Sequence, residues 1–284
     1  MKVIQVYGGP VYGTLGGREY VIRKLSEKLS KRGFEVKILC PGLGKNPAYH
    51  KVDQIKYIEI PSYKLSVRVC LPSLSSLRRI IQNLKEADLV HAHCPDNPFV
   101  FFSALISKFL HKPVITTVLA YADDFKHHDK INRMFGIFTA IQQTVAVWIS
   151  YRVHVENPYD ADKLHMYKHK VVVIPPGIEN YVLTGLPCPK TIQIIKDKIK
   201  YQKGENIVLF LGRTHKAKGV NHAISAVGIL RKAGYRVKLV IAGPSKNFFN
   251  ETEKYAKNFE SYRIVYLGKV TDKEKVALID MAGV

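Results

Sequence analysis

The chain has 284 residues, 46% of them hydrophobic, which is enough for about two domains and too apolar for global disorder. Its formal net charge of +21 favours polyanionic partners, such as phosphates, anionic lipid surfaces or nucleic acid, without choosing among them. The four cysteines are scattered without the spacing of a zinc site, which favours a reducing cytoplasm and gives no reason to expect a disulfide framework.

Strand and helix patterns alternate over the first part of the chain. Strands are predicted at residues 2–7, 36–40, 54–60, 88–92, 113–118, 153–155 and 171–174. Helices are predicted at residues 16–32, 73–85 and 97–110. Such alternation with short connections predicts a parallel sheet covered by helices on both faces, with ligand sites beyond the carboxyl ends of its strands.

The uncharged segment 134–151 has two interpretations, a membrane-spanning helix or a buried helix of a globular domain. Two consecutive amides, Gln142 and Gln143, interrupt its apolar character. Its apolar residues recur at helical spacing: Ile137, Ile141, Val145 and Trp148. We therefore expect a mostly buried helix.

The pattern restarts after a boundary expected at Gly177 and a linker-like segment at residues 184–189. Helices are predicted at 192–200, 221–233 and 251–259, strands at 207–211, 237–242 and 264–267, and a last helix after the capping box Thr271–Glu274. We predict domains at 1–183 and 190–284. A complete doubly wound domain usually has five or six strands, so we expect the second domain to be incomplete, either because the protein is short or because the sequence is a fragment.

A glycine-rich loop connects the first strand to the first helix and contains Gly16 and Gly17. Glycines let backbone N–H groups approach an anion, and the helix N-terminus adds partial positive charge. The spacing differs from a dinucleotide fingerprint, and no Gly-Lys-Ser/Thr follows as in a P-loop. Two interpretations of this loop therefore remain open: a phosphate-binding site and a flexible glycine loop.

The second candidate phosphate site is a basic turn, Leu211–Val220, which follows a strand predicted to be buried. Arg213 and Lys218 lie five residues apart in it. Two such cations can hold a diphosphate, and an arginine can do so through a bidentate fork. A solvated basic turn is the alternative.

Several stretches, taken in order, resemble motifs of the retaining GT-B glycosyltransferases. They are Gly16-Gly17-Arg18-Glu19, Asp88-Leu89-Val90-His91-Ala92-His93, Val173-Ile174-Pro175-Pro176-Gly177, Gly212-Arg213 with Lys218-Gly219, and Val240-Ile241-Ala242-Gly243. Each motif alone is common, but their order and spacing are specific, and the resemblance covers the whole chain.

The resemblance implies two Rossmann-like domains facing a cleft, the first binding the acceptor and the second a nucleotide-diphosphate sugar. Arg213 and Lys218 would hold the diphosphate and stabilise charge on the leaving group. The backbone at Gly16 and Gly17 would meet the same phosphates from across the cleft. Transfer would proceed with retention and would need no metal.

Two departures from the family pattern stand out. The sequence ends at Val284, before the point where the family places its E-x7-E segment, so the sugar- and ribose-binding half of the donor site is expected to be missing. Leu119 stands where a histidine is common. Asp123 and Asp124 follow it and are, with His93, candidates for acceptor binding. A structural role for His93 is equally open.

The leading hypothesis is a cytoplasmic glycosyltransferase that uses a nucleotide-diphosphate sugar as substrate and no other cofactor. Its basic first domain suits a lipid-linked or anionic glycan acceptor, with peripheral association at the inner membrane face. The alternative is a truncated, inactive homologue that binds only nucleotide or a partner chain. Nucleic-acid binding rests on charge alone and is not expected, because no aromatic-basic motif accompanies it.

Overall fold

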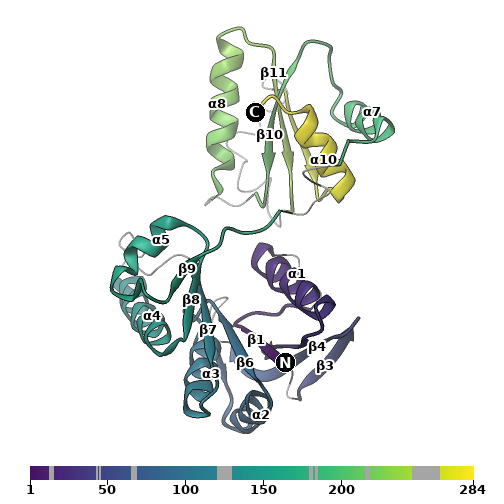
Figure 1. Cartoon of the computed structure of the whole chain (residues 1–284). Coiled ribbons are helices and arrows are strands. Elements are labelled where there is room, and N and C mark those ends of the chain that lie inside the picture. The colour runs from purple at the N-terminus through teal and green to yellow at the C-terminus, as the bar shows by residue number, and fades with distance from the viewer. Residues whose placement is uncertain are drawn as a thin grey trace. The chain divides into compact units, whose positions relative to one another are not determined.

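The computed structural model describes residues 1–12, 16–42, 44, 46–64, 69–119, 130–178, 182, 185–214, 218–244 and 263–284, with the backbone alone at 130–135. These residues form two compact α/β units, residues 1–177 and 178–284 (Figure 1). The helix predicted at 251–259 and the candidates Asp123 and Asp124 lie outside the described residues.

Unit 1 is built on a nine-stranded sheet in the order β3-β4-β2-β1-β6-β7-β8-β9, with β5 pairing with β4. Its strands are β1 (Lys2–Tyr7), β2 (Glu35–Gly42), β3 (Ala48–Val52), β4 (Ile55–Lys64), β5 (Cys70–Pro72), β6 (Leu89–His93), β7 (Val114–Val118), β8 (Arg152–Val155) and β9 (Val171–Val173). The run from β2 to β9 through β1 is parallel, which confirms the predicted parallel sheet.

The edge beyond β4 departs from the prediction. β3 and β5 were not predicted, and both pair with β4 in antiparallel fashion. The β3–β4 turn includes Asp53, whose φ of 52° lies in the left-handed region. Asp tolerates this conformation better than most residues. Since β3 is mostly exposed, its sequence has no clear apolar alternation from which a strand could be recognised.

The described helices of unit 1 are α1 (Gly17–Lys31), α2 (Leu74–Lys85), α3 (Pro98–Phe109), α4 (Lys130–Ile149), α5 (Pro158–Lys163) and the 3-10 turn η2 (His165–Tyr167). Three of them, α2, α3 and α5, begin directly after a polar N-cap residue. The side chain of Ser73 accepts from the N–H of Ser76 to cap α2, and Asn97 accepts from Phe99 to cap α3. Such caps replace hydrogen bonds that the first turn of a helix cannot make.

The two faces of the sheet in unit 1 differ in character. Ile4 and Val6 of β1 pack into an apolar core with residues of α2, α3 and α4, such as Phe99. Tyr7 points to the opposite face, where Ile22 of α1 packs beside it. Successive side chains on a strand alternate between faces, so α1 covers one side and α2–α4 the other (Figure 1).

Helix α4 is less buried than predicted, so the prediction of a mostly buried helix was wrong. Of the predicted stripe, Ile137, Ile141 and Trp148 are exposed, as is Phe138, whereas Val145 is partly buried against the core. The inward face instead carries Gln142 and Gln143, which are 1% and 2% exposed, beside the buried Ala146. Among the described helices, none combines the length and apolarity needed to cross a bilayer. α4 is therefore a half-buried helix with an apolar outer face.

Unit 2 contains a three-stranded parallel sheet in the order β10-β11-β12 among the described residues. Its elements are α7 (Pro189–Lys198), β10 (Asn206–Leu211), α8 (Val220–Lys232), β11 (Val237–Ala242), β12 (Ile264–Gly268) and α10 (Asp272–Met281). α8 packs on one face of this sheet, and α7 and α10 pack together on the other (Figure 1). The predicted capping box forms between Thr271 and Glu274.

A buried ion pair lies under α7 in unit 2. The Lys238 Nζ is 2.8 Å from the Glu205 carboxylate, and the two side chains are 1% and 3% exposed. Lys238 also donates to the carbonyls of Ile199 and Lys200, while Arg263 donates to Glu205. The charges are thus paired and hydrogen-bonded, as burial requires.

Candidate functional site

The carboxyl edge of the sheet in unit 2 is shaped by glycines. The N–H of Gly212 donates to Ala242, and the N–H of Gly243 donates to Gly268 at 2.7 Å. Gly243 has a φ of 150°, and a Cβ there would overlap the carbonyl oxygen of Gly212. The ends of β10 and β11 therefore approach more closely than side chains would allow.

The N-terminus of α8 opens at this same edge. Its N-cap is Gly219, with a φ of 76° and no side chain to accept from the first turn. The helix has 13 residues, so its first N–H groups carry the partial positive charge of an aligned peptide dipole. This geometry, which follows a parallel strand directly, is suited to an anion.

Arg213 and Lys218 flank the start of α8, and both are exposed. Among the described residues, neither forms an ion pair with a carboxylate. Their charges are therefore available to a ligand that meets the helix N-terminus. The intervening residues His215, Lys216 and Ala217 lie outside the described part of the chain.

Two buried polar atoms near α8 have no hydrogen-bond partner within the described structure. One is the hydroxyl of Thr214, a residue only 3% exposed, and the other is Oδ1 of Asn221 in the first turn of α8. Leaving such groups unpaired costs about 1–3 kcal/mol each. Sequence reasoning passed over both residues, and nothing in their spacing distinguishes them from ordinary turn residues.

Unit 1 has a cavity of about 600 Å³ on the face that carries α1. Its polar wall comes from three neighbouring strands, with His91 and His93 on β6, Thr117 on β7 and His154 on β8. Its apolar wall includes Val21, Ile22, Leu25 and Leu119. Strand alternation places these polar residues opposite the apolar core, so they form a hydrogen-bonding floor.

A directed chain of hydrogen bonds runs along this floor. His154 Nε2 is 2.8 Å from the carbonyl of Ile174, which can only accept, so this nitrogen carries the proton. His154 Nδ1 then accepts from the hydroxyl of Thr117 at 3.0 Å. The Thr117 oxygen is left to accept from His91 Nε2 at 2.7 Å. In this direction His91 Nε2 donates and His154 Nδ1 accepts.

Electrostatics favours the neutral forms of His91 and His93. Burial, and to a lesser extent repulsion from His154, lowers the pKa of His91 to about 3. Burial and its two histidine neighbours hold the pKa of His93 well below its ordinary value. The rings of His91 and His93 lie 3.9 Å apart, and a proton on either would repel the other. Both are hydrogen-bonding groups at neutral pH rather than cations.

His93 is also held from behind by Gln5. Its Nε2 lies 2.5 Å from Gln5 Oε1, and the amide nitrogen of Gln5 is buried without a partner among the described residues. The nearby thiol of Cys94 lines the cavity, but burial raises its pKa to about 12, so it stays protonated at neutral pH. The cavity therefore offers hydrogen bonds rather than a thiolate nucleophile.

Gly16 and Gly17 begin α1 beside this cavity, and Gly17 lines it. Gly16 is the N-cap and provides no side chain for the first turn. The carboxylate of Glu19 turns back toward Gly16 and accepts from the hydroxyl of Tyr7 at 3.0 Å. The predicted glycines thus form an open helix start with an acidic side chain next to it.

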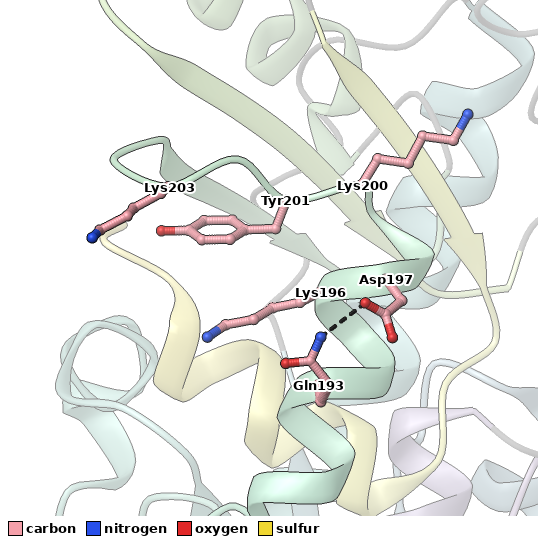
Figure 2. A pocket seen from close by; sticks show the side chains of 6 residues that line it. All are labelled: Gln193, Lys196, Asp197, Lys200, Tyr201 and Lys203. Carbon is pink, nitrogen blue, oxygen red and sulfur yellow. Dashed lines mark hydrogen bonds between the residues drawn. The ribbon is translucent and has the colours of Figure 1, made fainter.

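A second hollow, of about 780 Å³, lies in unit 2 and is strongly basic. Figure 2 shows that Lys196, Tyr201 and Lys203 project to the same side of it, while Lys200 extends away. Lys200 to Lys203 directly precede β10, so the hollow lies at the amino edge of the sheet. Ligands of parallel sheets bind at the opposite edge, and we do not assign this hollow to the site.

The structure places the predicted residues in two groups. Arg213 and Lys218 lie at the carboxyl edge of unit 2, and Gly17 and His93 line the cavity of unit 1. Sequence reasoning missed Thr117 and His154, whose roles depend on strand register. No cluster of His, Cys, Asp or Glu suited to a metal ion occurs among the residues that the structure describes.

Family models match both units. The model for Glycosyltransferase Family 4 matches residues 15–180, and the model for Glycosyl transferases group 1 matches residues 191–284. The chain belongs to glycosyltransferase family 4. Sequence comparison with curated proteins gives no match.

Solved structures show the same fold at low sequence identity. Sucrose-phosphate synthase from Thermosynechococcus elongatus has a TM-score of 0.67 at 15% identity, over 98% of this chain and 72% of that one. A glycosyltransferase from Rickettsia africae has a TM-score of 0.66 at 17% identity, over 99% and 71%. HepE from Anabaena, solved with UDP and glucose, has a TM-score of 0.65 at 12% identity, over 99% and 72%. The family member described here thus has the GT-B fold.

Proposed function

We propose that this glycosyltransferase moves a sugar from a nucleotide-diphosphate sugar to an acceptor, with retention and without a metal. The observation that carries the proposal is the uncapped N-terminus of α8, which two exposed cations, Arg213 and Lys218, flank without a described carboxylate partner. HepE, which shares the fold, was solved with UDP, a nucleoside diphosphate.

The chemistry of a diphosphate leaving group explains why this arrangement serves transfer. Negative charge grows on the diphosphate as the bond to the sugar breaks. Positioned cations and N–H groups stabilise that charge more in the transition state than in the ground state, which lowers the barrier. Arg213, Lys218 and the dipole of α8 would together supply the positive charge that a divalent ion supplies in other transferases.

The cavity of unit 1 is the proposed acceptor site. Its floor of neutral histidines and Thr117 offers hydrogen bonds to hydroxyl groups, and its apolar wall suits the face of a sugar ring or a lipid-linked carrier. His93 lies on this floor, and its role in acceptor binding stays a proposal. The acceptor roles of Asp123 and Asp124, and the donor role of Gly16 and Gly17, stay predictions.

Calorimetry with UDP, GDP and ADP tests the donor site. Arg213→Ala and Lys218→Ala should each weaken binding of the preferred nucleotide roughly 10- to 100-fold, since each removes a charge-assisted hydrogen bond of about 1.5–3 kcal/mol. Lys232→Ala is the matched control, because it removes an equal charge from the far end of α8. Unchanged affinity in both site variants would refute the assignment.

Product analysis tests the reaction itself. A screen of labelled nucleotide sugars should identify a donor, NMR of the product should show the anomeric configuration of the donor, and transfer should persist in EDTA. An inverted product would refute retention, and loss of transfer in EDTA would refute metal independence. Nucleotide binding without any transfer would favour the alternative of a nucleotide-binding homologue.

A further inference from the structure

The outer face of α4 has an unusual composition for a solvent-facing helix surface. Ile137, Phe138 and Ile141 are 51–58% exposed, and Trp148 is 68% exposed, while Gln142 lies buried underneath. An amphipathic helix in water normally turns its amides outward and its aromatics inward. Although Ala146, Val147 and Ile149 are also buried, this exposed apolar stripe indicates that the outer face is adapted to surroundings other than water.

α3 extends this apolar surface. It packs against α4, and both helices cover the same face of the sheet (Figure 1). Phe102 and Phe109, seven residues apart on α3, are 37% and 79% exposed. We call the outward apolar side chains of the two helices the α3–α4 surface: Phe102, Phe109, Ile137, Phe138, Ile141 and Trp148.

Along α3 and α4 and the residues that directly follow each helix, the charged residues have one sign, whereas Asp123, Asp124 and Asp129 lie in the segment between the two helices. Residues 98–122 and 130–155 contain no Asp or Glu. Their described cations lie near the C-terminal ends of the two helices: Lys108, Lys112 and Arg152. Arg152 stacks on the exposed ring of Tyr151, with its guanidinium carbon 4.9 Å from the ring centroid. An apolar surface with basic ends complements an anionic lipid surface.

We propose that the α3–α4 surface rests on an anionic membrane, with its Trp and Phe side chains at the level of the lipid headgroups and its Lys and Arg residues on the phosphates. This inference concerns a different part of unit 1 from the acceptor cavity and does not depend on the donor assignment.

Trp148 provides a site-specific probe, because it is the only tryptophan of the chain. Its fluorescence should shift to the blue with vesicles of phosphatidylglycerol and phosphatidylcholine, and doxyl-labelled lipid should quench it. Vesicles of phosphatidylcholine alone should leave the spectrum unchanged at physiological salt, and added salt should weaken the response. An unchanged spectrum with anionic vesicles would overturn the proposal.

Vesicle sedimentation tests the surface with a matched pair of variants. Ile141→Ser should weaken binding to the anionic vesicles at least fivefold, while Ile229→Ser, at an equally apolar and 69% exposed position of α8, should leave it unchanged. Circular dichroism confirms folding of both variants, and their nucleotide affinity should stay that of the wild type. Equal weakening by both variants would overturn the proposal.

Light scattering separates the lipid from a second protein copy. If the α3–α4 surface were a dimer interface, the chain would be dimeric without lipid, and Ile141→Ser would make it monomeric. That outcome would also overturn the proposal. Retention of duplex DNA by the wild-type chain, lost in Ile141→Ser, would assign the surface to nucleic acid instead.

Discussion

The hydroxyl of Thr214 is buried beside the start of α8 and has no partner among the described residues, which makes it the sharpest probe of the donor site. Thr214→Val replaces it with a methyl group of similar shape, so the free energy of unfolding of the ligand-free protein should stay equal or rise by about 1 kcal/mol. Nucleotide affinity should fall severalfold, because a bound phosphate would lose a donor. Urea denaturation and calorimetry measure the two effects.

Thr214→Ser is the control for this prediction, since it keeps the hydroxyl and should keep the affinity. A purely structural role for Thr214 would leave nucleotide binding unchanged in the valine variant as well.

The neutral histidines of unit 1 predict a dependence of stability on pH. The pKa of His91 is about 3 in the folded protein and near 6.5 in an unfolded chain. The unfolded state therefore binds more protons between these values, so stability is lost as the pH falls from about 6.5 toward 3. The expected slope is up to about 1.4 kcal/mol per pH unit for each such histidine.

His91→Gln removes the titrating group and keeps a polar side chain. Urea midpoints measured at pH 7 and pH 5 should differ less in this variant than in the wild type. The same difference in both proteins would show that His91 is charged in the folded state or that other groups dominate.

At the scale of single elements, the stability of β11 depends on the buried charge of Lys238. Among the described residues, Lys238→Ala leaves Arg263 as the sole cationic partner of the buried Glu205 carboxylate, and it should lower the free energy of unfolding by about 3–5 kcal/mol. Lys198→Ala removes an equal charge from the exposed pair with Glu274 and should cost less than about 1 kcal/mol. Urea denaturation compares the two, and similar losses would contradict the assignment.

The elements also show where sequence reasoning ends. Periodicity predicted α4 but not its orientation, because the stripe of Ile137, Ile141 and Trp148 is more apolar than the amide-containing side that the fold buries. Arg213 and Lys218 were predictable because they lie close together in one motif. The floor of His91, His93, Thr117 and His154, with Gln5 behind it, was not predictable as a group, because strand pairing across four strands brings these residues together.

On the scale of the whole molecule, each unit has its own sheet and its own apolar core. Separate cores predict separate cooperative transitions, so calorimetric unfolding should show two components. Saturating nucleoside diphosphate should raise the transition of unit 2, with about 2.7 kcal/mol of added stability at a concentration 100 times the dissociation constant. A single unfolding transition for the whole chain, moved to higher temperature by the nucleotide, would contradict the independence of the two units.

The close approach of Gly212 and Gly243 has a consequence for how this protein tolerates genetic variation. Position 243 has no room for a Cβ atom. Among variants carrying each of the twenty amino acids there, we expect only the glycine protein to fold. Changes a few positions away on the solvent side of α8 should be nearly silent. Sequence variation in the second half of the chain should therefore spare position 243, where two strands end, while neighbouring surface positions vary.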